Sequence, residues 1–236
     1  MKIGLISDIH GNYAALDAVL ADLAKDNVDQ IICLGDALSS GPQPREVLAR
    51  LLAEDVALVL GNTDQRLLHP IAPDGLSEHV RMLMEIEAWI RQVVPEEELA
   101  QLGNARQTIS VKLDERLQLL CCHGSPGSVE DRLLAQLTDE QLDQVLAGRQ
   151  FGILAAGHTH IPMVRSYGTR LLVNPGSVGS AVGTGPIAHY GLLTAAAGRM
   201  EFCLRTVTYD VGPAILQAHR HQMPHAAWWA ERWATE

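Results

Sequence analysis

The sequence has little of what several classes of protein require. Its 18 lysines and arginines are outnumbered by 28 aspartates and glutamates, which gives a formal net charge of −10 at pH 7. Proteins that form stable complexes with long nucleic acids carry a basic surface, so this charge argues against that class. It does not exclude an anionic substrate, because bound cations can reverse the charge of a site.

Long apolar runs are also missing. No stretch approaches the roughly 18 apolar residues of a membrane span, so we expect no membrane association. The start, Met1 to Ile6, is a short apolar run that lacks the longer apolar region and cleavage site of a signal peptide. There are only four cysteines, and none has the paired spacing of a zinc site. Reduced thiols in a cytoplasmic protein are the simplest interpretation.

What is present indicates one α/β domain. The 236 residues, 47% of them hydrophobic, suffice for a single sizeable core. Near the N-terminus, apolar runs alternate with segments that carry apolar residues at helical spacing, and this βαβαβ order predicts a parallel sheet covered by helices. The predicted strands are Lys2–Ser7, Gln30–Leu34 and Val56–Leu60, and the predicted helices are Tyr13–Lys25 and one that begins at Pro44.

The order of elements then changes. Residues 65–105 have a mainly helical pattern, with Ser77 as a candidate N-cap and Pro95 opening a second helix. We therefore predict one domain over 1–210, with this segment as a helical insert after the third strand, and a helical tail over 211–236. A helix ending at Leu146 interrupts a more antiparallel set of strands, predicted at Gln107–Leu113, Arg116–Cys122, Gly152–Ala156, Met163–Tyr167, Arg170–Val173, Tyr190–Thr194 and Met200–Tyr209.

Short polar motifs follow five of the predicted strands. Side chains just past strand ends converge on one rim of an α/β sheet, where ligands usually bind. Flanking glycines allow the backbone to turn sharply there. The motifs are Asp8-Ile9-His10, Gly35-Asp36, Gly61-Asn62-Thr63-Asp64, His123-Gly124 and Gly157-His158-Thr159-His160.

The residue types in these motifs are those that divalent metal ions accept as ligands. In Asp8-x-His10 and His158-x-His160 the two side chains are two residues apart, so both can face one way if the segment is extended. Neither pair is specific alone. Five such motifs in this order, each after a strand, predict a metal centre.

Together the motifs resemble those of the calcineurin-like metallophosphoesterase superfamily. The resemblance runs from about Met1 to Val178 and is strongest to the small bacterial branch that includes YfcE-type phosphodiesterases. That branch also shows an Asn-Pro-Gly-Ser-Val-Gly segment, here Asn174 to Gly179. The resemblance implies a four-layer αββα sandwich of two mixed β-sheets, and a binuclear centre of two divalent transition-metal ions (Mn, Fe, Zn, Co or Ni).

The resemblance also implies the ligands and the chemistry. Asp36 would bridge the two ions, and a metal-bound hydroxide would be the nucleophile. Two divalent ions with two carboxylates would leave a surplus of about +2, which suits a phosphate anion. The implied catalytic residues are Asp36, Asn62, Thr63 and Asp64. The implied ligands of one ion are Asp8, His10, Asp36 and His160, and those of the other are Asp36, Asn62, His123 and His158.

One position departs from the family pattern. Many relatives have a histidine after the Gly-Asn pair, where it contacts the phosphate and can protonate the leaving group, but here the residue is Thr63. A threonine hydroxyl can hydrogen-bond a phosphate oxygen but cannot act as an acid near neutral pH. We therefore expect leaving groups that are already acidic or are stabilised by a metal. Alternatively, His69 or His79 in the insert replaces the acid, rather than being an ordinary exposed histidine.

Two other features have alternative interpretations. Gly176 and Ser177 could join Asn62 and Thr63 in binding substrate by offering backbone N–H groups to a phosphate, or could simply turn the chain near the metals. The tryptophan-rich tail, residues 228–233, could pack on the core or form a contact in a homodimer.

The predicted function is hydrolysis of a phosphodiester or nucleotide pyrophosphate bond in a small phosphorylated substrate, for which a nucleotide is one candidate. The alternatives are a phosphomonoesterase, including a protein phosphatase, and a dinucleoside polyphosphate hydrolase. A non-catalytic scaffold on the same fold is a more remote alternative, because every expected ligand is present. The charge balance also predicts no stable nucleic-acid complex.

Overall fold

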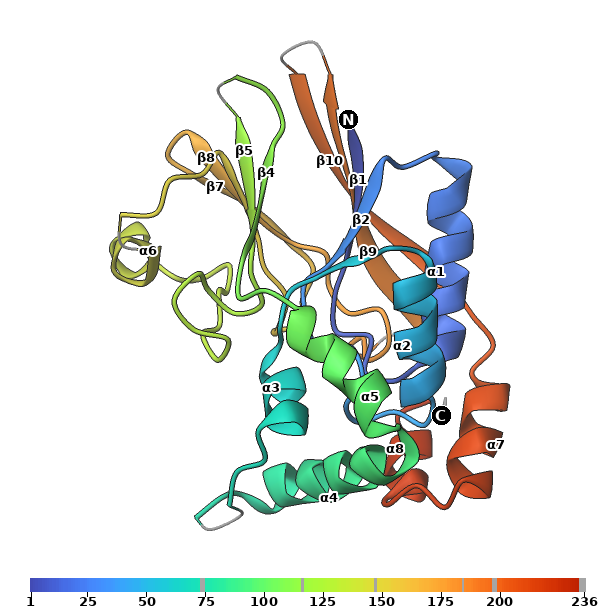
Figure 1. The fold of residues 1–236 in the computed structure, drawn as a ribbon. Coiled ribbons are helices and arrows are strands. Elements are labelled where there is room, and N and C mark those ends of the chain that lie inside the picture. The colour runs from blue at the N-terminus through green and yellow to red at the C-terminus, as the bar shows by residue number, and fades with distance from the viewer. Residues whose placement is uncertain (73–74, 116, 147, 184, 197–198, 234–236) are drawn as a thin grey trace.

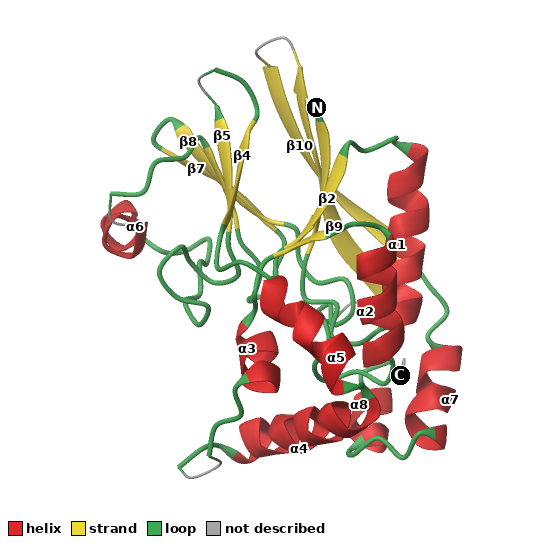
Figure 2. Cartoon of the chain, in the orientation of Figure 1, coloured by secondary structure: helices red, strands yellow, loops and turns green. Residues whose placement is uncertain are grey.

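Two β-sheets lie face to face between layers of helices in the computed structural model (Figures 1 and 2). The structure describes residues 1–236 except 73–74, 116, 147, 184, 197–198 and 234–236. Each sheet has five strands and contains both parallel and antiparallel pairs. This arrangement confirms the predicted αββα sandwich of two mixed sheets.

The first sheet contains the parallel strands of the N-terminal βαβαβ pattern. Its order is β10-β9-β1-β2-β3, with β1, β2 and β3 parallel and β9 and β10 added antiparallel. The strands next to its centre are continuous apolar runs, because both faces of the sheet are covered. The bounds are β1 (Lys2–Ile6), β2 (Gln30–Cys33), β3 (Ala57–Leu58), β9 (Ile187–Ala196) and β10 (Arg199–Thr208).

The second sheet has the order β4-β5-β6-β8-β7. Strands β5, β6 and β8 are parallel, and β4 and β7 are antiparallel edge strands. Gly168, at φ +56°, supplies the left-handed residue that the β7–β8 turn requires. The bounds are β4 (Ile109–Lys112), β5 (Gln118–Cys121), β6 (Ile153–Ala155), β7 (Met163–Tyr167) and β8 (Arg170–Asn174).

Helices cover the outer faces of both sheets. Helices α1 and α2 lie against the first sheet, and α6 lies beyond the second sheet (Figure 1). Ser77 caps α4 as predicted, because its side chain accepts a hydrogen bond from the Val80 N–H. None of the described helices is long and apolar enough to cross a membrane. The bounds are α1 (Tyr13–Lys25), α2 (Pro44–Ala53), α3 (Asn62–Leu68), α4 (Glu78–Val93), α5 (Glu96–Leu99), the 3-10 helix η1 (Ala100–Asn104), α6 (Asp139–Leu146), α7 (Gly212–Arg220) and α8 (Ala226–Glu231).

Three apolar clusters hold the layers together. One lies between the sheets and includes Ile3 and Ile153, and another joins the second sheet to α6. The third joins the first sheet to its helices and includes Trp229 and Trp233 near the C-terminus. These two tryptophans are 1% and 7% exposed, so both pack on the core as one of the two interpretations expected. A homodimer stays a prediction.

Several predicted strand bounds differ from the structure. Strand β3 ends at Leu58 rather than Leu60. Beyond Val59 the chain pairs with a distant segment instead of β2, and Leu60 N–H donates to the Arg106 carbonyl at 2.9 Å. The strand predicted from Gln107 begins at Ile109. Strand β9 begins at residue 187, earlier than predicted, because it pairs with β10 along its whole length. The predicted strand start at residue 116 lies outside the described residues.

Candidate metal centre

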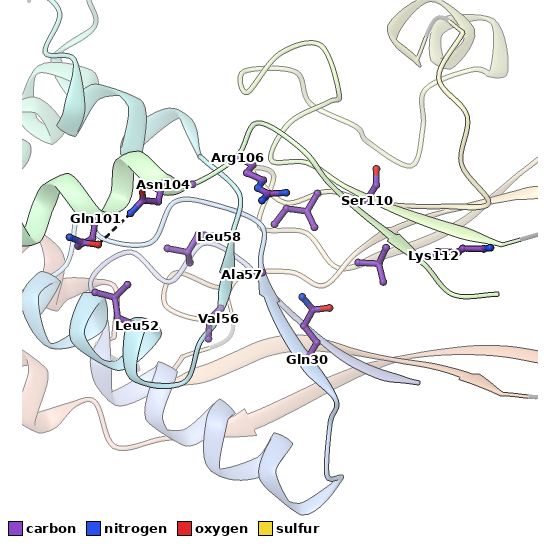
Figure 3. A pocket seen from close by; sticks show the side chains of 13 residues that line it. Gln30, Leu52, Val56, Ala57, Leu58, Gln101, Asn104, Arg106, Ser110 and Lys112 are labelled. Carbon is purple, nitrogen blue, oxygen red and sulfur yellow. Dashed lines mark hydrogen bonds between the residues drawn. The ribbon is translucent and has the colours of Figure 1, made fainter. Parts of the chain in front are cut away.

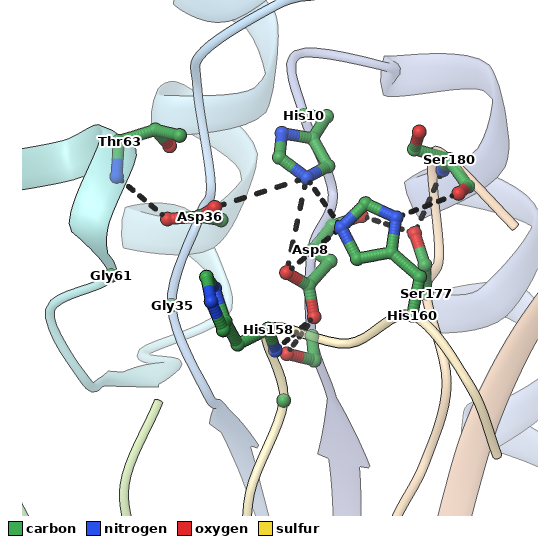
Figure 4. Close-up of polar contacts among 12 residues, drawn as sticks. Asp8, His10, Gly35, Asp36, Gly61, Thr63, His158, His160, Ser177 and Ser180 are labelled. Atoms are coloured by element: carbon green, nitrogen blue, oxygen red, sulfur yellow. Dashed lines mark hydrogen bonds and ion pairs between the residues drawn. The ribbon is translucent and has the colours of Figure 1, made fainter. Parts of the chain in front are cut away.

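Six of the predicted ligands lie on loops that follow β1, β2, β5 and β6, and Asn62 is the first residue of α3, just after β3. These loops meet at the carboxyl ends of the parallel strands of both sheets, and Figure 4 shows side chains from them pointing toward one another. The structure therefore brings together all seven residues that the sequence analysis selected as ligands. Most of them are buried, and Asp8 and His123 have no exposed surface.

The first group contains Asp8, His10 and His160, whose ligand atoms lie within 4.8 Å of one another. The two histidine Nε2 atoms are 3.0 Å apart, and the Asp8 Oδ1 atom is 3.3 Å from His160 Nε2. The opposite ring nitrogens, Nδ1, face the carbonyls of Ser39 and Ser180 at 3.0 and 2.8 Å, so they carry the protons. Two Nε2 lone pairs and a buried carboxylate oxygen without a hydrogen-bond donor thus converge, and a cation fits this set of donor atoms.

The second group lies on the other side of Asp36. His123 Nδ1 faces the Leu34 carbonyl at 2.8 Å, which leaves the Nε2 lone pair pointing at Asp36 Oδ1, 3.5 Å away. One end of the Asn62 amide is 3.0 Å from His123 Nε2, 3.1 Å from Asp36 Oδ2 and 3.3 Å from His158 Nδ1. If the amide nitrogen occupies that end, it donates hydrogen bonds. If the amide oxygen occupies that end, it faces three other acceptors with no donor between them. A cation bound there would satisfy all four.

Asp36 is positioned between the two groups. Its Oδ1 faces His123, and its Oδ2 is 3.9 Å from His10 Nε2. Each carboxylate oxygen therefore faces a histidine of a different group, as the bridging assignment requires. The ligand atoms of Asp8, Asp36 and His123 also lie within 4.8 Å of one another, so Asp8 is close to both groups rather than to one alone.

The backbone of the site is strained. Five of the seven ligands have a positive φ: Asp8 (53°), His10 (51°), Asp36 (54°), His158 (65°) and His160 (59°). Among the described residues only ten that are not glycine have this conformation, and such residues cost of order 1–3 kcal/mol each. Strained residues persist only where the surrounding fold holds them, and they cluster at binding and catalytic sites. Their concentration on the ligand loops therefore indicates a functional site.

Burial and neighbouring charges set the protonation of the site. Burial and the nearby charge of His160 lower the pKa of His10 to about 4, and burial and His123 lower the pKa of His158. Burial raises the pKa of Asp8, but His160 and the other histidines outweigh it and hold the pKa below its usual range. Burial lowers the pKa of His123 and His160, but Asp8 and Asp36 outweigh it and raise the pKa of both. Metal ions bind the neutral imidazole, so a bound ion has to displace the protons that these two histidines hold.

Comparison with known proteins gives an independent observation. The family model described as the calcineurin-like phosphoesterase superfamily domain matches residues 1–198. The chain belongs to the calcineurin-like phosphoesterase superfamily.

Relatives extend the match over most of the chain. The uncharacterised protein MJ0912 of Methanocaldococcus jannaschii is 27% identical over 98% of this chain and 96% of its own. The phosphodiesterase YfcE of Escherichia coli is 30% identical over 82% of this chain and 87% of its own. The crystal structure of a metallophosphoesterase from Sphaerobacter thermophilus superposes with a TM-score of 0.76 at 24% identity and covers 98% of this chain and 97% of its own. The chain is thus a metallophosphoesterase superfamily member related to YfcE.

Asp64 and Thr63 are the predicted catalytic residues that are not predicted ligands. The Asp64 carboxylate accepts hydrogen bonds from the backbone N–H groups of Asp36 (2.8 Å), Ala37 (3.0 Å) and Gly61 (3.1 Å), so it fixes two ligand loops. Burial and Asp36 raise its pKa to about 7, although these N–H groups act in the opposite direction. The Thr63 N–H donates to Asp36 Oδ1, while its buried hydroxyl has no partner among the described residues.

Gly176 and Ser177 are already hydrogen-bonded within the protein. The Gly176 N–H donates to Asn174 Oδ1 at 2.8 Å, and the Ser177 hydroxyl donates to the Asp8 carbonyl at 2.7 Å and accepts from Ser180 N. Ser177 therefore holds the loop that carries Asp8, whereas the Gly176 bond stays within its own turn. Substrate contact by these two residues stays a prediction, as it does for Asn62 and Thr63.

The two insert histidines lie outside this cluster of ligands. Both His69 and His79 are exposed, and the His79 ring packs against Trp228 with ring centroids 5.9 Å apart. No described contact joins either histidine to a ligand. The structure thus gives no support to an acid supplied by these side chains.

The sequence analysis missed two charged residues beside the site. Arg66 of α3 lies one helical turn after Asn62, and Glu87 of α4 pairs with it at 2.8 Å. Helical spacing alone could have placed Arg66 on the same face as Asn62. Nothing in the sequence connects Glu87 to them.

A separate cavity of about 590 Å³ lies at the edge strands β3 and β4 (Figure 3). Leu58, Arg106 and Lys112 are among its lining residues, and none of the predicted ligands lines it. Its polar side chains are basic or uncharged, so it lacks the carboxylates and imidazoles that make up the loop cluster. The cavity is therefore separate from the cluster of predicted ligands.

Gly61 provides a steric test of the ligand loops. A Cβ at Gly61 would lie 2.1 Å from Asp36 Oδ1 and 2.3 Å from Asp36 N, whereas a Cβ at Gly103 would meet nothing within 4 Å. Gly61→Ala should therefore displace Asp36, lower the free energy of unfolding by about 1–3 kcal/mol and weaken Mn²⁺ binding. Gly103→Ala should change neither quantity appreciably. Urea unfolding and calorimetric Mn²⁺ titration measure both, and equal behaviour of the two variants would contradict the packing described here.

Proposed function

We propose that this phosphoesterase is a binuclear, metal-dependent phosphodiesterase that hydrolyses a phosphodiester or nucleotide pyrophosphate bond in a small phosphorylated substrate. One observation carries the proposal: histidine Nε2 atoms converge with carboxylate oxygens on both sides of Asp36, and one of these oxygens, Asp8 Oδ1, is buried without a hydrogen-bond donor. The 30% identity to a phosphodiesterase, YfcE, supports a diester substrate.

The roles follow from the placement of the side chains. Asp8, His10, Asp36 and His160 would hold one divalent ion, and Asp36, Asn62, His123 and His158 the other. When bound, the ions would activate water and stabilise charge on the phosphate oxygens. Ser39, Ser180 and Leu34 orient the imidazoles through their carbonyls, and Asp64 holds the loops that carry Asp36 and Asn62.

The test is metal content measured together with activity. Protein purified without a chelator should contain about two transition-metal ions per chain if both sites fill. Addition of Mn²⁺ should support hydrolysis of bis-p-nitrophenyl phosphate, and addition of a chelator should abolish this activity. His160→Ala should lower both metal content and rate, because the Nε2 atom of His160 faces Asp8 and His10.

A matched histidine variant serves as the control. His225 lies at the surface and bonds Glu85 at 2.8 Å, so His225→Ala should leave metal content and rate unchanged. Less than one metal ion per chain, with no gain in activity on adding Mn²⁺, would contradict the proposal. Hydrolysis of monoesters or dinucleoside polyphosphates, with no turnover of diesters, would show that the substrate belongs to one of the alternative classes and would contradict the proposed diester substrate.

A further inference from the structure

The arginine missed by the sequence analysis is held beside the site in a fixed orientation. The Nε and Nη2 groups of Arg66 donate to the carboxylate of Glu87, at 3.1 and 2.8 Å from Oε1. The Arg66 side chain is 13% exposed and that of Glu87 is 2% exposed. Ser39 donates its hydroxyl to the same carboxylate at 3.2 Å, so Glu87 is fixed from two directions.

The pair with Glu87 uses Nε and Nη2 of Arg66, so the third nitrogen, Nη1, can donate a hydrogen bond to another group. The Nη1 group lies 3.2 Å from the far end of the Asn62 amide and has no other hydrogen-bond partner among the described residues. When Asn62 turns its oxygen toward Asp36, His123 and His158, its nitrogen must face Arg66. Two N–H donors then lie 3.2 Å apart with no acceptor between them.

We infer that Arg66 is a substrate-binding residue, whose Nη1 donates together with the Asn62 amide nitrogen to a non-bridging oxygen of the substrate phosphate. The inference rests on the proposed function, since Asn62 takes this orientation as a metal ligand. An oxygen between the two donors would satisfy both. Arginine keeps its charge at all relevant pH values, so Arg66 stabilises negative charge on the phosphate and supplies no proton.

Other arginines of the insert are not equivalent to Arg66. Arg91 Nη1 donates to the Arg66 carbonyl, and Arg81 Nη1 donates to the Leu76 carbonyl. The competing interpretation of Arg66 is structural: its pair with Glu87 would only tie α3 to α4. A purely structural role predicts that loss of Arg66 destabilises the fold but leaves the phosphate Kd unchanged. The phosphate Kd therefore distinguishes the two interpretations.

The experiment titrates inorganic phosphate into the Mn²⁺-loaded protein by calorimetry. A double variant, Arg66→Gln with Glu87→Gln, removes the charge without leaving a buried carboxylate unpaired. It should raise the phosphate Kd by about 10- to 100-fold, the usual effect of losing a charged hydrogen bond, while the Mn²⁺ Kd stays unchanged. Arg66→Lys keeps the pair with Glu87 but cannot reach both partners, so it should also weaken phosphate binding.

The control removes an Arg–Glu pair at the surface, away from the site. Arg45 and Glu98 form a surface pair at 2.8 Å, with Arg45 58% exposed, so Arg45→Gln with Glu98→Gln should leave the phosphate Kd unchanged. Phosphate affinity equal to wild type in both Arg66 variants would overturn the inference while the proposed function stands. A loss of phosphate affinity that follows an equal loss of Mn²⁺ binding would also overturn it. A Mn²⁺-loaded wild type that binds no phosphate and hydrolyses no diester would overturn both proposals.

Discussion

Replacing Asp36 with asparagine should abolish both metal-binding steps in a Mn²⁺ titration and nearly all phosphoesterase activity. The carboxylate is 3% exposed, and its two oxygens face His123 and His10, which belong to different groups of ligands. Substitution of an outer-shell partner of a metal site typically costs about 10–100-fold in affinity or activity. The loss of a ligand shared by two ions should cost more than that.

Asparagine has nearly the shape of aspartate, so the fold should survive this substitution. Its side-chain oxygen can still accept the hydrogen bond that the Thr63 N–H donates to Asp36 Oδ1 at 3.0 Å. The melting temperature of the metal-free protein checks this point. Asn62→Ala is the comparison, because Asn62 faces only the second group and its loss should mainly weaken one binding step. Equal metal retention in the two variants would refute the bridging assignment.

The ligand set could be predicted from sequence because of how α/β sheets are built. Apolar strands are easy to locate, and a polar residue directly after a strand must lie at the carboxyl end of the sheet. Asp8, Asp36 and His123 all follow this rule. The left-handed backbone at Asp8 and Asp36 gives no comparable signal, since it depends on contacts with distant loops, such as the bond from Asp8 N to the Gly35 carbonyl at 2.9 Å.

The groups that surround the ligands could not be predicted in the same way. A carboxylate in a motif that follows a strand can face a metal or backbone N–H groups, and Asp64 faces three N–H groups. Glu87 lies in the middle of a helix whose sequence shows only ordinary helical spacing. Its contact with Arg66 forms because α4 packs against α3. Such packing between two helices cannot be predicted from the sequence around either residue. The early end of β3 has a similar origin in pairing with the segment near Arg106.

Turnover should fall steeply as the pKa of the leaving group rises, because Thr63 cannot donate a proton. General-acid catalysis contributes about 10²–10⁴-fold in rate, so an alkyl monoester such as glycerol phosphate should be hydrolysed far more slowly than bis-p-nitrophenyl phosphate. The Thr63 hydroxyl is buried without a partner among the described residues, and the backbone N–H of Thr63 donates to Asp36 Oδ1. We expect this hydroxyl to bind a phosphate oxygen of the substrate. The measurement is kcat/KM across leaving groups of graded pKa.

Two variants at this position separate binding by the hydroxyl from proton donation. Thr63→Val removes the hydroxyl at nearly constant volume, so it should raise KM and leave the dependence on leaving-group pKa as steep as in the wild type. Thr63→His should flatten that dependence if the imidazole reaches the leaving oxygen, because it restores an acid that titrates near neutral pH. A flat dependence in the wild-type enzyme would contradict the prediction and show that another acid is present. The variants His69→Ala and His79→Ala would then test whether the acid is a histidine of the insert, since loss of the acid must make the dependence steep.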